Sequence, residues 1–558
     1  MRTVAYGLFL VLLFAGALIL LRSGHPRDDG RTPSERLAKL VGHGVPTIDL
    51  DRLGDASAED LFQLGVEYQQ MWRVREAAEI FERAVAADST HHGAWVRLIE
   101  CYASPLVGDE AALHRAVTRA AATVPSPADT MLVAGLRALY EDRDYAAAIT
   151  ALAGVARGND AVVDARYHLA LAYFMLGRLS DTSRHLDPLL KEDATIGPVA
   201  ELSIRRSVAA GQLERAAGDA RELARLFPEE AFPYVLIAQV ELARGNTAEA
   251  VEFCNSALQI DPRCVPAIMT RACLYAAAGD LESARVSYEK LMLFDEFGLA
   301  SIGHEGIAFV DFLAGDFEDG VDQMDEAIRH AMLAGSQRRG VGLAARLVEY
   351  LCQLGQADAA EGVVERWITG FGEVPVRLAR ARIQVLQGDF ESANEVLTHV
   401  TTEKQWVLWS RMLSLDVTEL AALAEIGRER ATQALVMLND PQKEPSATGA
   451  GSRERRAFLS GYAAFEAGDA ESAAASFAAV RARLFGLEFP YHGDPVLHVQ
   501  ALFFLGESEL ARGNRDAARE SYESFLSYWE EAAWDLEAVA RSRQKLEALG
   551  VAGAVPQG

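Results

Sequence analysis

The sequence predicts an all-α protein, a right-handed α-solenoid of helix-turn-helix repeats that is preceded by one N-terminal transmembrane helix. Three observations predict this fold. Five consecutive blocks of 34 residues superpose without an insertion, one column of these blocks is almost always glycine, and residues 3–21 form an uncharged apolar stretch. Such a period is typical of repeats that stack because no single unit can bury its own apolar face.

The 34-residue blocks begin at Asp129, Val163, Gly197, Ala231 and Val265. Their fifteenth column holds Gly177, Gly211, Gly245 and Gly279, with Arg143 as the exception. Each glycine lies between two apolar patterns of helical spacing, and glycine adopts the left-handed backbone of a tight turn at little cost. Small residues such as Ala250 in the twentieth column allow two helices to cross closely, and Pro228 and Pro262 end the second helix.

These columns resemble the tetratricopeptide repeat. In the block from Ala231 the matching residues are Tyr234, Ala238, Gly245, Ala250, Ala257 and Pro262. An earlier unit begins at Ala58, and later units, slightly out of phase, surround Gly315, Gly355, Gly388, Gly468 and Gly513. Residues 403–438 are helical in pattern but lack the repeat columns, so we interpret them as a degenerate helix pair.

Composition and repeats together divide the chain into six expected segments. They are a transmembrane signal-anchor helix at 1–22, a tether at 23–57, a tetratricopeptide-repeat solenoid at 58–438, a flexible loop at 439–453, a C-terminal repeat block with a capping helix at 454–550, and a tail at 551–558. The loop is rich in turn formers and is expected to be flexible, and the sequence leaves open whether the C-terminal block moves about it. The cap is expected because the last repeat would otherwise expose its stacking face.

The apolar N-terminus predicts attachment to a membrane. Residues 3–21 approach the roughly 20 apolar residues that a spanning helix needs, and Arg2 and Arg22 flank them. The long apolar core favours an uncleaved single-pass anchor in a bacterial cytoplasmic membrane, and a cleaved export signal is the alternative. The side that the repeats face stays open, because the positive-inside rule and the short basic N-terminus point in opposite directions.

Charge and motifs argue against several classes of function. The chain has 54 basic and 80 acidic side chains, a net charge of −26, which disfavours nucleic-acid binding. Residues 340–345 match a dinucleotide fingerprint but lack the strand that this motif requires, and His91-His92 has no second ligand pair at a suitable spacing. We therefore expect no enzymatic activity, no catalytic residues, no metal, no cofactor and no small-molecule substrate.

The resemblance implies that the first helices of successive repeats line a concave groove that binds extended or helical peptides. The residues that we assign to this partner-binding groove are Tyr140, Tyr167, Leu171, Phe174, Met175, Arg205, Phe232, Val235, Gln239 and Met269. Most are apolar or aromatic, which suits an apolar peptide segment or an amphipathic helix. The alternative is that Phe174 and Met175 pack against the neighbouring repeat, since an apolar stripe of helical spacing is core by default.

Two functions follow from these features. The first is a membrane-anchored, non-catalytic scaffold or adaptor that binds protein or peptide partners in the concave groove. The second is a membrane-tethered regulator of an envelope biosynthetic enzyme or protease, similar to the lipopolysaccharide-assembly protein B family. That family also combines an N-terminal anchor with these repeats, but it ends in a zinc-binding Cys-x-x-Cys module that this sequence lacks.

Overall fold

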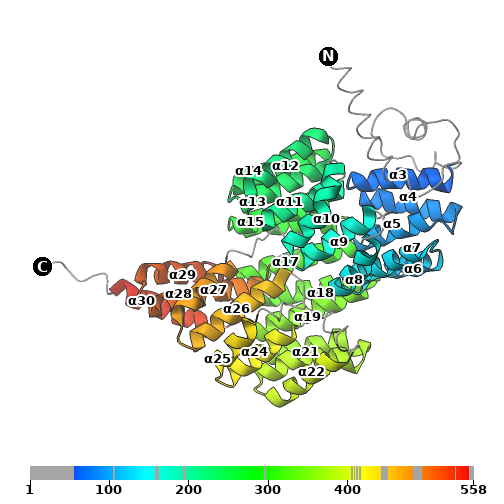
Figure 1. Ribbon diagram of the computed structural model, residues 1–558. Helices are drawn as coiled ribbons and strands as arrows, with labels where there is room; N and C mark the ends of the chain where they lie inside the picture. Colours follow the sequence, from blue (N-terminus) through cyan, green and yellow to red (C-terminus); the bar gives the residue numbers. More distant parts are fainter. Residues whose placement is uncertain are drawn as a thin grey trace. The chain divides into compact units, whose positions relative to one another are not determined.

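The computed structural model describes residues 56–104, 107, 109–156, 163–192, 197–294, 297–403, 406, 409, 413, 416–440, 450–481, 493–534 and 536–551. In these ranges the chain is helical and contains no strand, as the sequence predicts (Figure 1). The expected anchor at 1–22, nearly all of the tether, residues 441–449 of the expected loop, and residues 552–558 of the tail lie outside the described residues. Among the helices that are described, none is both long and apolar enough to cross a membrane.

The chain divides into two compact units. Unit 1 comprises residues up to Arg244 together with Ser256–Pro262, and unit 2 comprises Gly245–Asn255 and Arg263–Gly558. The boundary between the two units falls around α14 (Thr247–Ile260).

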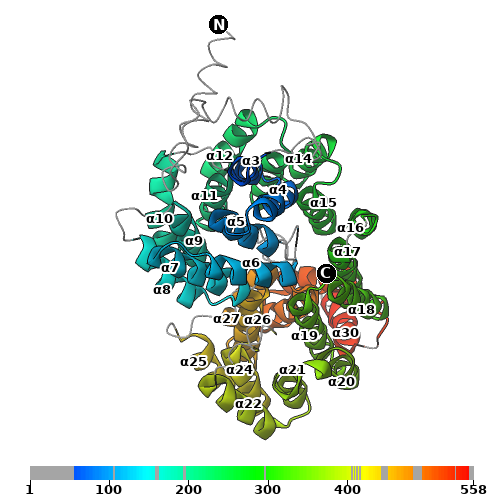
Figure 2. The same cartoon turned by 90° about the vertical axis from the view of Figure 1, so that its right-hand side faces the viewer.

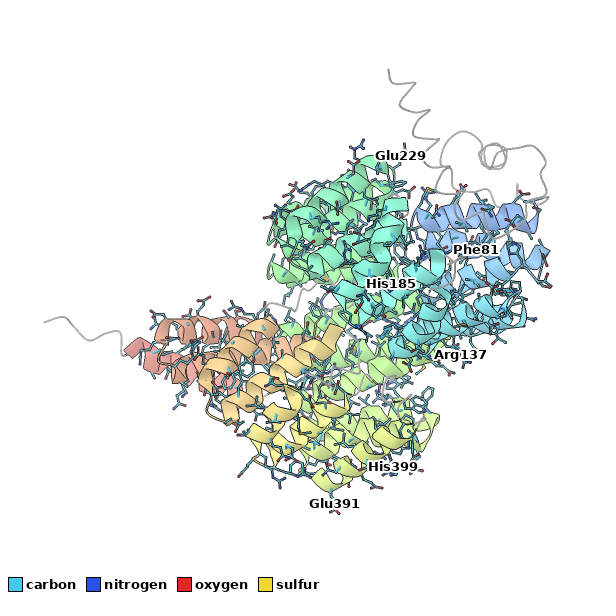
Figure 3. The ribbon with its side chains drawn as sticks, viewed as in Figure 1. Phe81, Arg137, His185, Glu229, Glu391 and His399 are labelled. Carbon is cyan, nitrogen blue, oxygen red and sulfur yellow. The ribbon has the colours of Figure 1, made fainter. Side chains whose placement is uncertain are left out.

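Unit 1 is a stack of antiparallel helix pairs. Its helices are α3 (Ala58–Gln70), α4 (Val74–Ala87), α5 (His92–Ala103), α6 (Glu110–Ala122), α7 (Pro127–Leu136), η3 (Arg137–Glu141), α8 (Tyr145–Ala156), α9 (Val163–Met175), α10 (Leu179–Glu192), α11 (Gly197–Ala209), α12 (Leu213–Leu226) and α13 (Ala231–Ala243). The two helices of a pair cross closely because small residues lie at the crossing. At Gly65 an added Cβ would lie 2.5 Å from the ring of Phe81, which is fully buried and labelled in Figure 3.

The expected glycine turns are confirmed. Gly177, Gly211, Gly245 and Gly279 have φ angles of 71°, 70°, 82° and 79°. Arg143, the exception in that column, has a φ of 50°, so the turn keeps its left-handed geometry without glycine. Trp72 (φ 60°) and Glu429 (φ 62°) are also left-handed, and each lies in a turn between two paired helices. The left-handed turn geometry is therefore kept even in repeats where another residue replaces glycine.

Unit 2 continues the same architecture. Its helices are α15 (Val265–Ala277), α16 (Leu281–Met292), α17 (Phe297–Ala314), α18 (Phe317–Leu333), α19 (Gln337–Gln353), α20 (Ala357–Val363), η4 (Val364–Ile368), η5 (Thr369–Phe371), α21 (Glu373–Leu386), α22 (Phe390–Thr402), α24 (Val417–Gly427), α25 (Ala431–Leu438), α26 (Ala450–Glu466), α27 (Ala470–Arg481), α28 (Pro495–Ala511), α29 (Arg515–Trp529) and α30 (Glu537–Val551). Helices α17, α18 and α19 have 18, 17 and 17 residues, which explains why the repeat loses its phase there.

The helices on the two sides of the expected loop pack on one another. Ala422 of α24 and Leu438 of α25 share a buried apolar cluster with Leu459 and Ala463 of α26. Within the segment that we interpreted as a degenerate pair, residues 417–438 form the hairpin of α24 and α25, with Glu429 at the turn. Repeats on the two sides of residues 441–449 therefore pack directly on one another.

The end of unit 2 folds back onto earlier helices of the same unit. The indole nitrogen of Trp529 donates to the carbonyl of Phe312 at 3.1 Å, and the amide of Ala533 donates to the carbonyl of Gly315 at 3.1 Å. The ring of Trp529 also packs edge-on against Phe317, 5.2 Å away. Helix α29 thus packs against α17 and α18 as well as against α28, and the orange and red C-terminal helices adjoin green α17 in Figure 2.

Candidate functional site

The inner face of unit 1 is the side on which the first helices of successive pairs meet. Helix α3 contacts α5, α5 contacts η3, and α11 contacts both α9 and α13. Eight of the ten predicted groove residues lie on α9, α11 and α13, and Tyr140 lies on η3. Helix η3 is a π-helical turn that continues α7, and such turns often mark functional positions.

A hydrogen-bonded network around Glu100 lies on this face. Its carboxylate accepts bonds from Gln69 at 2.7 Å and from Arg97 at 3.1 and 3.3 Å. A ring nitrogen of His168 lies 3.0 Å from the same carboxylate, and the other ring nitrogen lies 3.0 Å from the hydroxyl of Tyr140. Burial raises the pKa of Glu100, but Arg97 and His168 outweigh it and lower this pKa to about 2. The carboxylate is therefore ionised and fixed, and it holds Tyr140 in place through His168.

Tyr167 lies beside this network. Its ring packs edge-on against His168 with the centroids 5.1 Å apart, and burial raises the pKa of its hydroxyl. On α11, Arg205 pairs with Glu201 at 2.8 Å. Arg97 and Arg205 are therefore both engaged by carboxylates of the same unit.

The first turn of unit 1 closes onto its last helices. The indole nitrogen of Trp72 donates to Glu201 at 3.1 Å, and the ring stacks on Phe232. The guanidinium of Arg73 donates to both carboxylate oxygens of Glu230, at 2.7 and 3.2 Å. These contacts join residues that are 129 and 157 positions apart in the sequence. They bound the inner face at one end.

Comparison with known proteins supports the repeat assignment. A family model described as tetratricopeptide repeat matches residues 133–181, 204–263 and 458–537. The chain contains tetratricopeptide repeats. A comparison with curated proteins found no match.

Several solved structures are similar to this chain. PilW, a widely conserved type IV pilus biogenesis factor, is 18% identical over 38% of this chain and 96% of its own, with a TM-score of 0.27. Yeast Tom70 is 12% identical over 90% of this chain and 97% of its own, with a TM-score of 0.28. A tetratricopeptide repeat protein from Parabacteroides merdae is 13% identical over 49% and 98%, with a TM-score of 0.30. Similarities this weak carry no argument about partners or pathway.

The ten predicted groove residues fall into two groups. Side chains of the first group are half-buried, and they belong to Tyr140, Tyr167, Leu171, Phe174, Met175, Arg205 and Phe232. Those of the second group are buried in the tetratricopeptide core, and they belong to Val235, Gln239 and Met269. Met269 lies on α15, in unit 2, whereas the other nine residues lie in unit 1. Whether any of them binds a partner stays a prediction.

The contacts of Phe174 agree with the alternative interpretation, in which its side chain packs against the neighbouring repeat. With Tyr167 and Leu171 it packs against a buried cluster that includes Leu186 of α10 and Leu202 of α11. This contact between neighbouring tetratricopeptide repeats leaves part of its ring for the inner face.

Sequence reasoning missed the residues that bound and fix the inner face, namely Trp72, Arg73, Glu100, His168 and Glu230. One signal was present for Trp72, which occupies the turn column of the repeat that begins at Ala58, where glycine is usual. A bulky residue at a left-handed turn indicates a compensating contact elsewhere. No comparable signal marks Glu100 or His168, because their partners lie on other repeats.

The described part of the chain offers no grouping of three or more His, Cys, Asp or Glu side chains that fits a metal ion. None of its five cysteines forms a disulfide, and four of them are buried. Burial raises the pKa of the Cys273 and Cys352 thiols to about 12. Such thiols are poor nucleophiles, so they pack as small core residues.

Proposed function

We propose that the chain is a non-catalytic scaffold, anchored to a membrane through residues 1–22, whose tetratricopeptide repeats bind protein or peptide partners. The observation that carries this proposal is the set of half-buried aromatic side chains on the inner face of unit 1. Tyr140, Tyr167 and Phe232 are held there by contacts within the unit. Rings that are fixed in advance lose little conformational freedom on binding, and tyrosine is enriched among the residues that dominate binding energy.

The charged residues of the inner face limit the kinds of partner that could bind there. Arg97, Arg73 and Arg205 pair with Glu100, Glu230 and Glu201 respectively. A partner gains little from charges that are already paired, since it would have to break existing ion pairs. The proposed occupant is therefore a peptide segment that presents apolar side chains to the aromatic rings.

Site-specific photocrosslinking tests the proposed surface. A photoreactive phenylalanine analogue replaces Tyr140 or Phe174 in the full-length protein in its native membranes, and captured proteins are identified by mass spectrometry. The matched control carries the analogue at Glu222, an exposed residue of α12. We expect one protein to be captured from positions 140 and 174 and not from 222. Capture from position 222 alone would place the partner-binding surface on the second helix of each repeat, such as α12.

The membrane anchor requires a separate test. We expect the full-length protein to stay in the membrane pellet after extraction with alkaline carbonate, and a variant without residues 1–22 to be released. Release of the full-length protein under these conditions would contradict the anchor while leaving the partner-binding proposal intact.

The regulator of an envelope enzyme or protease remains the alternative function. It shares the anchor and the repeats with the scaffold, and none of the contacts described above favours it. The captured partner distinguishes the two, because a regulator would be crosslinked to the enzyme that it controls.

A further inference from the structure

Helices α19, α21, α24, α26 and α28 of unit 2 are labelled in Figure 1. They meet around buried charged side chains, which we name the inner charge cluster. Its members are Glu349, Arg382, Asp416, Glu419, Glu454, Arg455 and Asp494. Six of them are buried, and the side chain of Arg455 is 12% exposed. Charged side chains are rarely this buried in such number, because each loses its hydration.

The end of unit 2 returns to α19 at this cluster. The amide of Gln353 donates to Asp494 at 3.0 Å, and the amide of Gln500 donates to the carbonyl of Gln353 at 2.8 Å. The backbone amide of Asp494 in turn donates to Glu454 at 2.9 Å. The first two bonds tie α19 to α28 and its N-cap across 141 and 147 positions of sequence, and the third ties that N-cap to α26. Separation of the last hairpins from α19 would break the first two.

Negative charge exceeds positive charge in the cluster, with five carboxylates and two guanidinium groups. The guanidinium of Arg455 lies 3.0 Å from Glu419 and 3.9 Å from Glu349. Arg382 pairs with Glu349 and lies 3.9 Å from Glu419. Both arginines are thus shared by the same two glutamates. Asp416 and Asp494 accept hydrogen bonds from backbone amides instead, and Asp494 also accepts one from Gln353.

Two oxygens of the cluster are buried without a hydrogen-bond donor among the described residues, Glu419 Oε1 and Asp416 Oδ2. A charged oxygen in this position is costly, and a proton removes the charge. Burial raises the pKa of Glu419 to about 7 against the opposing effect of Arg455. Burial and the charge of Glu349 raise the pKa of Asp494 to about 6.

We propose that the inner charge cluster takes up at least one proton when the last two hairpins of unit 2, formed by α26 to α29, close against α19. Mildly acidic solution then favours this closed form, and alkaline solution weakens it. Glu419 and Asp494 have pKa values that lie above the roughly 4 of exposed carboxyl groups. Their contribution to stability is complete below pH 4 and is lost as the pH rises through about 6 to 7.

Other titratable groups near the cluster do not produce this dependence. Burial holds the pKa of Tyr350 on α19 well above its usual value, so the phenol stays neutral. Burial, with Arg481, lowers the pKa of His498 on α28 to about 4. The contribution of His498 is lost as the pH falls from about 6.5 to 4, so its sign is opposite. Arg346 on α19 pairs with Glu305 of α17 and keeps its charge throughout.

Amide hydrogen exchange of the full-length protein tests the proposal. Protection factors, corrected for the intrinsic exchange rate at each pH, are measured for α28 and for the last turn of α19 between pH 5.5 and 8.0. We expect at least about a tenfold loss of protection over this range. Glu419→Gln and Asp494→Asn imitate the protonated groups, and asparagine still caps α28. Each variant is expected to be more protected than the parent at pH 8.0 and to depend less on pH.

A matched control comes from unit 1. Glu100 is a buried carboxylate whose pKa is low, so Glu100→Gln is expected to lower protection in α5 equally at both pH values and to leave α28 unchanged. The proposal is overturned if parent protection in α28 is constant from pH 5.5 to 8.0. Lower protection of Glu419→Gln and Asp494→Asn than of the parent at pH 8.0 would also overturn it, because the charged carboxylates would then favour closure.

Discussion

The indole of Trp72 stacks on the ring of Phe232, with the ring centroids 5.4 Å apart and 28° between the ring planes. Trp72 lies in the turn after α3 with a φ of 60°, a left-handed conformation that costs a non-glycine residue about 1–2 kcal/mol. The contact to α13 therefore has to offset a local cost. The same turn contributes the ion pair of Arg73 with Glu230, so one strained turn closes unit 1.

Removal of the Trp72 ring is expected to destabilise unit 1. Trp72→Ala loses the stacking on Phe232 and the hydrogen bond to Glu201, and we expect a loss of about 2–3 kcal/mol, below the cost for a fully buried tryptophan. Urea denaturation of the single variants and of Trp72→Ala/Phe232→Ala measures the pair. We expect a coupling energy of about 0.5–1.5 kcal/mol. Strict additivity of the two substitutions would show that the stacking contributes nothing.

A substitution by glycine is expected to stabilise the protein where a left-handed turn residue makes no long-range contacts. Glu429 is exposed and has a φ of 62°, so Glu429→Gly is expected to stabilise the hairpin of α24 and α25 by roughly 0.5–1 kcal/mol. Gln433→Gly, at an exposed site inside α25, is the control and is expected to destabilise by about 1 kcal/mol. Thermal unfolding compares both variants with the parent, and equal losses would mean that Glu429 is not strained.

Enlargement of a crossing residue tests the repeat register. Ala250 of α14 is fully buried, and Ala250→Leu is expected to cost roughly 1–3 kcal/mol by overpacking. Ala248→Leu makes the same change at an exposed site of the same helix and is expected to change stability by less than about 0.5 kcal/mol. If the two variants unfold at the same temperature, the register of this repeat is wrong.

A charge at Phe174 tests whether this residue is core or groove. Because its ring packs against Leu186 and Leu202, Phe174→Glu is expected to destabilise unit 1 by roughly 1–3 kcal/mol, and Phe174→Leu by less. Circular dichroism during urea denaturation measures both. An unchanged midpoint for the glutamate variant would mean that the side chain stands free in the groove.

Much of the fold could be predicted because tetratricopeptide hairpins depend on short-range rules. Gly211, Gly245 and Gly279 mark turns, and Ala216, Ala250 and Ala284 mark crossings, since each acts on residues within the same repeat. The burial of the groove residues could not be predicted in the same way. Val235 and Met269 occupy columns that face a groove in the resembling family, yet here their side chains are buried. A column position gives the direction of a side chain and not the neighbour that covers it.

The sequence by itself determined the repeat, the turns and the small residues at the crossings, because each repeat packs mainly on its nearest neighbours. Only the tertiary structure decided which distant repeats meet. Three long-range contacts depend on a small rotation between repeats that accumulates over several repeats. They are the contacts of Trp72 with Phe232, of Trp529 with Phe312, and of Gln353 with Asp494. That rotation is set by the packing of many side chains together, so no single column of the sequence records where the stack returns on itself.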